Sequence, residues 1–81
     1  MPLTEQDVAL LAFEGEWHRH RGAKEEAIRT ELGLSPARYY QLLGRLIDTA
    51  GALEHDPMLV KRLRRVRDSR EQARLARAAG R

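Results

Sequence analysis

The chain has 81 residues, enough for one domain and too few for two, and a chain of this length buries only a modest share of its surface. An active-site cavity in such a domain would be shallow, so we do not expect an enzyme. The composition is 42% hydrophobic, 33% charged and 5% aromatic without cysteine, which favours a small helical protein and excludes a disulfide framework and any thiolate metal site.

Charge is distributed unevenly along the chain. The net charge is +3, but residues 1–56 hold six Lys/Arg against ten Asp/Glu, whereas residues 57–81 hold nine against two. Clustered cations favour an anionic partner, because their binding releases counterions from a polyphosphate. Apolar stretches are too short to span a membrane and the N-terminus does not resemble a signal peptide, so we expect a cytoplasmic protein without a membrane partner.

Hydrophobic periodicity predicts two helices in the first 33 residues. The first covers about residues 4–20, because Thr4 and Asp7 form a capping box at its start. Its apolar side chains recur every three or four residues: Val8, Leu10, Leu11, Phe13 and Trp17. The second helix covers about residues 23–32 and ends at Gly33.

Two further helices begin at a capping residue followed by proline. Ser35 and Pro36 supply an N-cap hydroxyl and a first helical residue that needs no N–H. The inward side chains of that helix are Tyr39, Leu42, Leu43, Leu46 and Ile47. Its pattern fades over residues 48–51, where we expect a loop or short turn. Asp56 and Pro57 repeat the capping pattern and begin a final helix that continues to Gly80.

The expected fold is therefore all-α and forms a single domain. Residues 1–56 form a three-helix core with a helix-turn-helix, and residues 57–81 form a long basic C-terminal helix. The inner face of that helix carries Leu59, Leu63 and Val66. Beyond Val66 the helix has little to bury.

The turn at residues 32–35 is the main functional signal. A short turn with glycine lets the second helix cross the first steeply, as in a helix-turn-helix, where the first turns of the second helix face base edges. The resulting DNA-binding candidates are Ser35, Pro36, Ala37, Arg38, Tyr40, Gln41, Gly44 and Arg45. Gln41 suits adenine, Arg38 or Arg45 suits guanine or phosphate, and Tyr40 suits a phosphate or a thymine methyl. A plain three-helix bundle is the alternative.

The C-terminal helix is the second candidate site. Residues 61–67 hold five cations, and Arg70, Arg74 and Arg77 extend the row along one face. The candidate phosphate contacts are Lys61, Arg62, Arg64, Arg65, Arg67, Arg70 and Arg74. The alternative is a solvated helix neutralised by Asp68, Glu71 and the acidic first half. A membrane-binding helix would need a bulkier apolar face.

Other polar residues give no catalytic, cofactor or metal site. His18 and His20 diverge by about 200 degrees on a helix and have arginine neighbours, so we do not expect a metal. His55 is expected to be a loop histidine at a helix N-terminus, and Trp17 the largest core residue. Two acidic pairs are assigned to the surface: Glu14 with Glu16, and Glu25 with Glu26.

Part of the chain resembles the promoter −35-reading helix-turn-helix of sigma factors, where Leu-Gly-x-Ser precedes the recognition helix. The matching stretch is Leu32-Gly33-Leu34-Ser35-Pro36-Ala37-Arg38-Tyr39-Tyr40-Gln41. Gln41 falls where the sigma pattern has a base-reading glutamine. Pro36, Ala37 and Tyr40 replace charged contacts, so the resemblance does not imply −35 recognition.

Over nearly its whole length the chain also resembles a family of small actinobacterial proteins of unknown function. The likeness rests on Gly22-Ala23-Lys24-Glu25, Arg38-Tyr39-Tyr40-Gln41, Leu46-Ile47-Asp48, His55-Asp56-Pro57-Met58-Leu59-Val60 and Arg62-Leu63-Arg64-Arg65. This resemblance implies a cytoplasmic actinobacterial protein with a helix-turn-helix fold, and it implies no activity.

These features predict a protein that binds double-stranded DNA at the nucleoid, as a transcriptional regulator or nucleoid-associated protein. One alternative is a protein-interaction module that binds RNA polymerase or a sigma factor, and another is an RNA-binding protein. A single short recognition helix binds weakly, so a homodimer through the first helix or through Leu59, Leu63 and Val66 is a further expectation.

Overall fold

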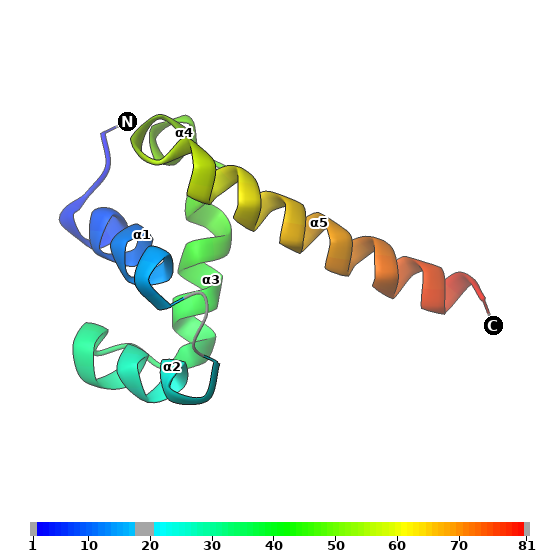
Figure 1. Ribbon diagram of the computed structural model, residues 1–81, viewed down its shortest axis with the longest axis horizontal. Coiled ribbons are helices and arrows are strands. Elements are labelled where there is room, and N and C mark those ends of the chain that lie inside the picture. The colour runs from blue at the N-terminus through cyan, green and yellow to red at the C-terminus, as the bar shows by residue number, and fades with distance from the viewer. Residues whose placement is uncertain (1, 18–20, 81) are drawn as a thin grey trace.

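The computed structural model describes residues 2–17 and 21–80, and Figure 1 shows their arrangement. Every regular element in these ranges is helical. In chain order they are α1 (Glu5–Trp17), α2 (Arg21–Ala27), the π-helix η1 (Ile28–Leu32), α3 (Pro36–Leu46), α4 (Ala50–His55) and α5 (Pro57–Ala79). The expected all-α fold is confirmed.

The helix starts expected from capping residues are confirmed. Thr4 Oγ1 accepts the Asp7 N–H and an Asp7 carboxylate oxygen accepts the Thr4 N–H, both at 3.0 Å. Ser35 Oγ accepts the Arg38 N–H at 3.1 Å, and the Asp56 carboxylate accepts the N–H three residues later at 3.3 Å. Each bond satisfies a backbone donor that has no partner within its own helix.

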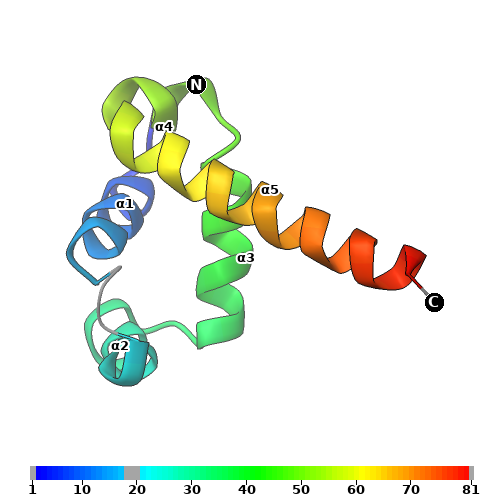
Figure 2. The same ribbon diagram turned by 45° about the vertical axis from the view of Figure 1, so that its right-hand side comes forward.

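The second helix begins at Arg21 and widens into η1 before the turn. Gly33 follows with φ at 66°, and its N–H donates to the Arg29 carbonyl at 3.1 Å. A Cβ is strained at such a φ, which explains the glycine at this helix end. Residues 33–35 then lead into α3, which is steeply inclined to α2 in both views (Figure 2).

One hydrophobic core joins the helices. α1 packs against α3, α3 against η1, and α4 against the start of α5. The buried hydrophobic residues are Leu10, Leu11, Phe13, Ala27, Ile28, Tyr39, Leu43, Leu46, Ile47, Ala52, Leu59 and Val60. The prediction that Val8 and Val66 face the core is wrong, because their side chains are 38% and 42% exposed at the edges of their apolar stripes. Trp17 is partly buried and packs at the margin of the core.

Helix α4 was not expected from the sequence. Thr49 Oγ1 accepts the Ala52 N–H at 3.1 Å and so caps the helix, and Ala52 is fully buried. A small residue lets α4 lie close to its neighbours, but it gives almost no hydrophobic period to detect. His55 directly precedes Asp56, the N-cap of α5, as expected, but it is the exposed last residue of α4 and so the expected loop position is wrong.

Helix α5 extends away from the core, as Figures 1 and 2 show. Leu59 and Val60 are buried and Leu63 is half-buried, but every residue from 65 to 80 is exposed. This agrees with the expectation that the last turns have little to bury. Of the three residues proposed for dimerisation on this helix, Leu59 is therefore buried within the chain, Leu63 is half-buried and Val66 is exposed. None of the described helices combines the length and apolar character needed to cross a membrane.

Candidate nucleic-acid interface

The outer face of α3 presents four candidate recognition residues to solvent: Ala37, Arg38, Gln41 and Arg45. Arg38 Nη1 donates to Gln41 Oε1 at 2.6 Å. A bidentate contact to adenine uses both the oxygen and the NH₂ group of a glutamine amide. The Arg38–Gln41 pair must therefore open before Gln41 can make that contact.

The remaining candidates on α3 do not share this face. Tyr40 is 46% exposed and Gly44 is half-buried, and both line a groove between α3 and α5. Pro36 is half-buried, and the Ser35 hydroxyl is engaged in the cap of α3. The structure thus divides the predicted recognition residues between an outer face and the side that faces α5.

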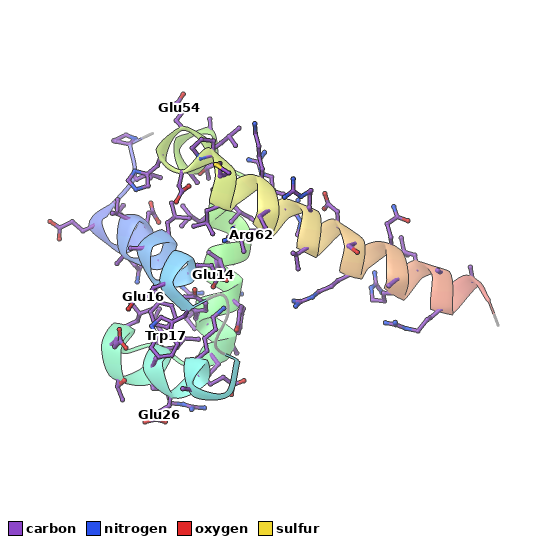
Figure 3. All side chains as sticks on the ribbon, viewed as in Figure 1. Glu14, Glu16, Trp17, Glu26, Glu54 and Arg62 are labelled. Atoms are coloured by element: carbon purple, nitrogen blue, oxygen red, sulfur yellow. The ribbon has the colours of Figure 1, made fainter. Side chains whose placement is uncertain are left out.

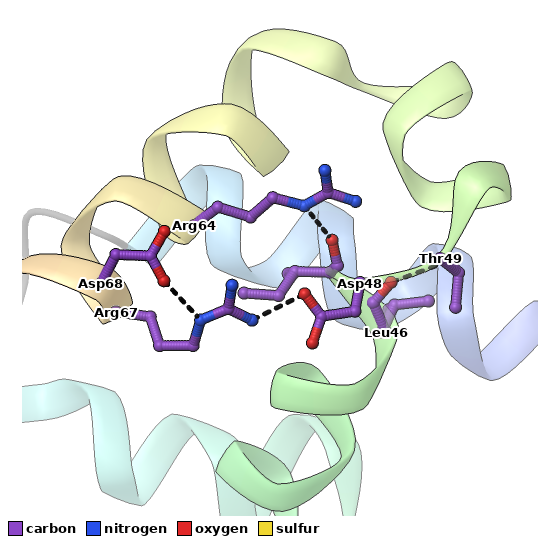
Figure 4. Close-up of polar contacts among 7 residues, drawn as sticks. Leu46, Asp48, Thr49, Arg64, Arg67 and Asp68 are labelled. Atoms are coloured by element: carbon purple, nitrogen blue, oxygen red, sulfur yellow. Dashed lines mark hydrogen bonds and ion pairs between the residues drawn. The ribbon is translucent and has the colours of Figure 1, made fainter. Parts of the chain in front are cut away.

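Arg64 and Arg67 attach α5 to the segment that follows α3 (Figure 4). Arg64 Nε donates to the Ile47 carbonyl at 2.5 Å, and Arg67 Nη1 lies 2.7 Å from the Asp48 carboxylate. The last carbonyls of a helix lack partners within it and carry partial negative charge, so cations are favoured there. These two arginines, expected to contact phosphate, are engaged within the chain and set the direction in which α5 leaves the core.

Arg67 is also held by its helix neighbour Asp68, whose carboxylate lies 3.2 Å from Arg67 Nε. Hydrogen bonds to Asp48 and then to Asp68 raise the pKa of the Arg67 guanidinium above its ordinary value. The pairs are exposed to solvent, so they stabilise the fold only weakly. Their effect is on orientation and on the availability of Arg67 to a phosphate.

The other cations of α5 differ in whether they form an ion pair within the chain. Arg74 pairs with Glu71 one turn earlier, through both Nε and Nη2. The remaining five cations of α5 have no ion-pair partner among the described residues: Lys61, Arg62, Arg65, Arg70 and Arg77. Residues nine apart lie on opposite sides of an α-helix, so Lys61 faces away from Arg70. The free cations therefore surround α5.

A buried ion pair between α1 and α2 was missed by the sequence reasoning. Lys24 Nζ lies 2.7 Å from Glu14 Oε1, and the side chains of Lys24 and Glu14 are only 11% and 6% exposed. Figure 3 shows Glu14 between α1 and α3. The surface assignment of Glu14 is wrong, whereas Glu16, Glu25 and Glu26 are exposed as expected. The sequence does contain a signal for the burial of Glu14, because this residue follows Leu10 and Leu11 by four and three residues and so lies on the apolar face of the helix.

Tyr39 adds α3 to this pair. Its hydroxyl donates to the same Glu14 oxygen at 2.6 Å. Burial, and then the hydrogen bond to Glu14, raise the pKa of the Tyr39 hydroxyl well above its ordinary range, so it stays a neutral donor. Glu14, Lys24 and Tyr39 form a polar cluster that joins α1, α2 and α3.

Aromatic contacts extend from this cluster toward the groove. The ring centroids of Tyr39 and Tyr40 are 5.1 Å apart in an edge-on arrangement, and Phe13 makes a similar contact with Tyr39 at 5.4 Å. Lys24 Nζ lies 5.3 Å from the Tyr40 ring centroid, within the range of a cation–π contact. Tyr40, a candidate DNA contact, is thus held in place on the side of α3 that faces α5.

The described residues contain no group of three or more His, Cys, Asp or Glu side chains placed to hold a metal ion. The pair His18 and His20, considered above for metal binding, lies outside the described residues.

Comparison with known proteins places the chain in a family. Among the curated proteins and among the solved structures, none matches this chain. A family model described as a protein of unknown function, DUF3263, matches residues 2–75. The match runs from the residues before α1 into the last part of α5, and it agrees with the expected membership of a family of unknown function. Because it covers nearly the whole sequence, the chain belongs to the DUF3263 family.

Proposed function

We propose that this protein binds double-stranded DNA as a helix-turn-helix protein. In this proposal α1, α2 with η1, and α3 are the three-helix core, α3 enters the major groove, and α5 contacts the phosphate backbone. The observation that carries the proposal is the set of free cations on α5, a helix that projects from the core past α3. Such an arrangement supplies both base and backbone contacts.

Base contacts fall to the outer face of α3. Arg38 and Gln41 lie within one turn of each other near the N-terminus of α3, the part of a recognition helix that reaches base edges. Their mutual hydrogen bond holds both side chains in place before binding. An adenine then competes with Arg38 for Gln41, while the released guanidinium is free for a guanine or a phosphate.

We assign the phosphate contacts to the α5 cations that have no partner among the described residues: Lys61, Arg62, Arg65 and Arg70, with Arg77 beyond them. Each phosphate neutralised adds about 0.9 to the slope of log affinity against log salt concentration. Because Lys61 and Arg70 lie on opposite sides of α5, one duplex contacts at most three of these four cations, and three contacts give a slope of about −2.7. We assign the protein to the nucleoid of an actinobacterial cell, as a transcriptional regulator or a nucleoid-associated protein.

The test is fluorescence anisotropy with a labelled duplex of random sequence, measured over a series of salt concentrations. Arg65→Gln removes one free cation without disturbing a contact of the fold, so the slope should become shallower by about 0.9. Arg29→Gln is the matched control, because Arg29 is an exposed arginine of η1 outside the proposed interface. A protein that binds no duplex at low salt contradicts the proposal, as does an equal effect of the two substitutions.

Selection of bound sequences from a random duplex pool then separates the two roles. An enriched motif identifies a regulator, and Gln41→Ala should change that motif while leaving the salt slope intact. Enrichment of base composition alone identifies a nucleoid-associated protein. Preference for single-stranded or structured RNA over duplex DNA would assign the cations to RNA instead.

A further inference from the structure

The groove between α3 and α5 has an apolar lining that DNA binding does not account for. Its volume is about 810 Å³, which is within the range of ligand-binding clefts in proteins. The apolar part of its lining consists of Tyr40, Leu43, Ile47, Leu63 and Val66. Leu43 and Ile47 are buried at its base, whereas Tyr40 and Val66 are exposed on opposite walls.

The geometry of the groove is fixed by contacts already described. Arg64 and Arg67 hold the base of α5 against Ile47 and Asp48, so the two walls meet at a defined angle. Tyr40 is held on the other wall by Tyr39 and Lys24. A surface supported in this way is formed before any partner arrives, which lowers the entropic cost of binding.

Charge along the groove is predominantly positive on the α5 side. Arg62 and Arg70 line this wall and have no ion-pair partner among residues 2–17 and 21–80, and Arg67 and Arg74 lie beside them. Lys24 is neutralised at the base by Glu14. The groove therefore combines an apolar lining with cations on one side that the chain itself leaves unneutralised.

This combination fits one kind of occupant. A helix with apolar side chains on one face and carboxylates along its flank would cover Val66 and Leu63 and pair with Arg62 and Arg70. From Leu63 to Arg74, α5 rises about 17 Å, the length of about three helical turns. A DNA duplex is a poorer fit, because its polyanionic surface leaves the apolar lining uncovered.

We propose that the groove between α3 and α5 binds an acidic amphipathic helix of a partner protein, which uses Arg62 and Arg70 and therefore competes with DNA for these two cations. The apolar lining supplies most of the buried contact, and the α5 cations select for acidic flanks. The proposal does not rest on DNA binding, because Val66 and Leu63 contribute nothing to a phosphate contact.

The probes are fluorescein-labelled synthetic helices of about 15 residues, near the shortest length that is stable alone. Three such peptides carry leucine, isoleucine or phenylalanine on one face and glutamate on the flanks. One control peptide has the same composition with its apolar residues spread around the helix, and another has lysine in place of glutamate. Binding should require both the single apolar face and the acidic flanks.

Two pairs of variants locate the site. Val66→Gln should weaken peptide binding about tenfold or more, whereas Leu75→Gln, an exposed residue nine positions later on the opposite side of α5, should leave it unchanged. Arg70→Gln should weaken it more than Arg65→Gln. Duplex DNA is measured with the same proteins, and there Val66→Gln should have no effect.

Several results would overturn this assignment. One is binding of none of the three peptides, and another is equal binding of the peptide with scattered apolar residues. A concentration-dependent self-association that Val66→Gln abolishes would identify a second copy of this chain as the occupant. Loss of DNA binding on Val66→Gln, with an unchanged circular dichroism spectrum, would assign the groove to nucleic acid.

Discussion

Substitution of Lys24 by methionine tests the buried cluster that joins the first three helices. Methionine keeps the apolar stem of lysine but removes the ammonium group. Of the two groups that contact the buried Glu14 carboxylate, Lys24 and Tyr39, only the Tyr39 hydroxyl then remains. Removing one member of a buried ion pair costs about 3–5 kcal/mol. The Tyr39 hydrogen bond remains and Lys24 is 11% exposed, so we expect about 2–3 kcal/mol.

That loss is large for a domain of this size. A chain of 81 residues is expected to have a free energy of unfolding of about 4–12 kcal/mol. The midpoint temperature of unfolding falls by about 4–8 °C for each kcal/mol in such a domain, so Lys24→Met should lower it by at least about 8 °C. Urea unfolding followed by far-ultraviolet circular dichroism measures the free energy directly.

Two further variants show whether the ion pair is the cause. Lys61→Met is the matched control, because Lys61 is exposed on α5 without an ion pair, and it should change stability by less than about 0.5 kcal/mol. The double variant Glu14→Gln with Lys24→Met removes the buried charge but keeps an acceptor for Tyr39, so it should recover most of the loss. An unchanged midpoint for Lys24→Met, or a double variant no more stable than it, would refute the reasoning.

Three further outcomes are expected. Burial, and then the hydrogen bond to Glu14, raise the pKa of the Tyr39 hydroxyl in the folded protein. The stability that this hydroxyl contributes is therefore complete below about pH 10, and it is lost as the pH rises further. In urea titrations above about pH 10, the free energy of unfolding should fall by about 1.4 kcal/mol per pH unit more than that of Tyr39→Phe. Parallel pH profiles of the two proteins would contradict this. Gly33→Ala should cost about 1–2 kcal/mol at a φ of 66°, whereas Gly22→Ala, with open space around its Cβ, should cost nothing; equal urea midpoints would show that the turn is not strained by a side chain. Arg64→Gln should increase hydrogen exchange in the first turns of α5, because the bond to the Ile47 carbonyl is lost, and Arg65→Gln should not.

The helix starts were predictable because their signals are local. Thr4, Ser35 and Asp56 each lie within three residues of the backbone donor that they cap. A proline at the next position strengthens the signal at two of these starts. Helix α4 has a local cap at Thr49 as well, but no apolar stripe follows it, so the cap alone did not identify a helix.

The buried cluster could not be derived from local pattern. Glu14 and Lys24 are ten residues apart, and Glu14 and Tyr39 are twenty-five apart, so the pairing depends on how three helices pack. An acidic residue on an apolar stripe is a warning of burial, but its partner is fixed only by the fold. A charged pair at this position is consistent with a role in setting the register of α1, α2 and α3.

The run of arginines in α5 illustrates the same limit at the candidate site. The sequence pattern predicts one group of phosphate-binding cations over residues 61–67. In the structure, Arg64 and Arg67 contact the segment at the end of α3, whereas Arg62 and Arg65 have no ion-pair partner among the described residues. The difference arises because α5 packs on the core only through its first turns. Residues on the packed side find carbonyl or carboxylate oxygens, and the others remain in solvent.

This division determines what a salt titration of DNA binding reports. The Arg67–Asp48 pair is exposed and therefore screened by salt, but Leu59 and Val60 are buried and the Arg64 bond to Ile47 is made to a neutral carbonyl. The direction of α5 thus depends mainly on contacts that salt affects weakly. A change of slope in Arg65→Gln then reports the loss of a phosphate contact, because α5 keeps its orientation over the range of salt concentrations used.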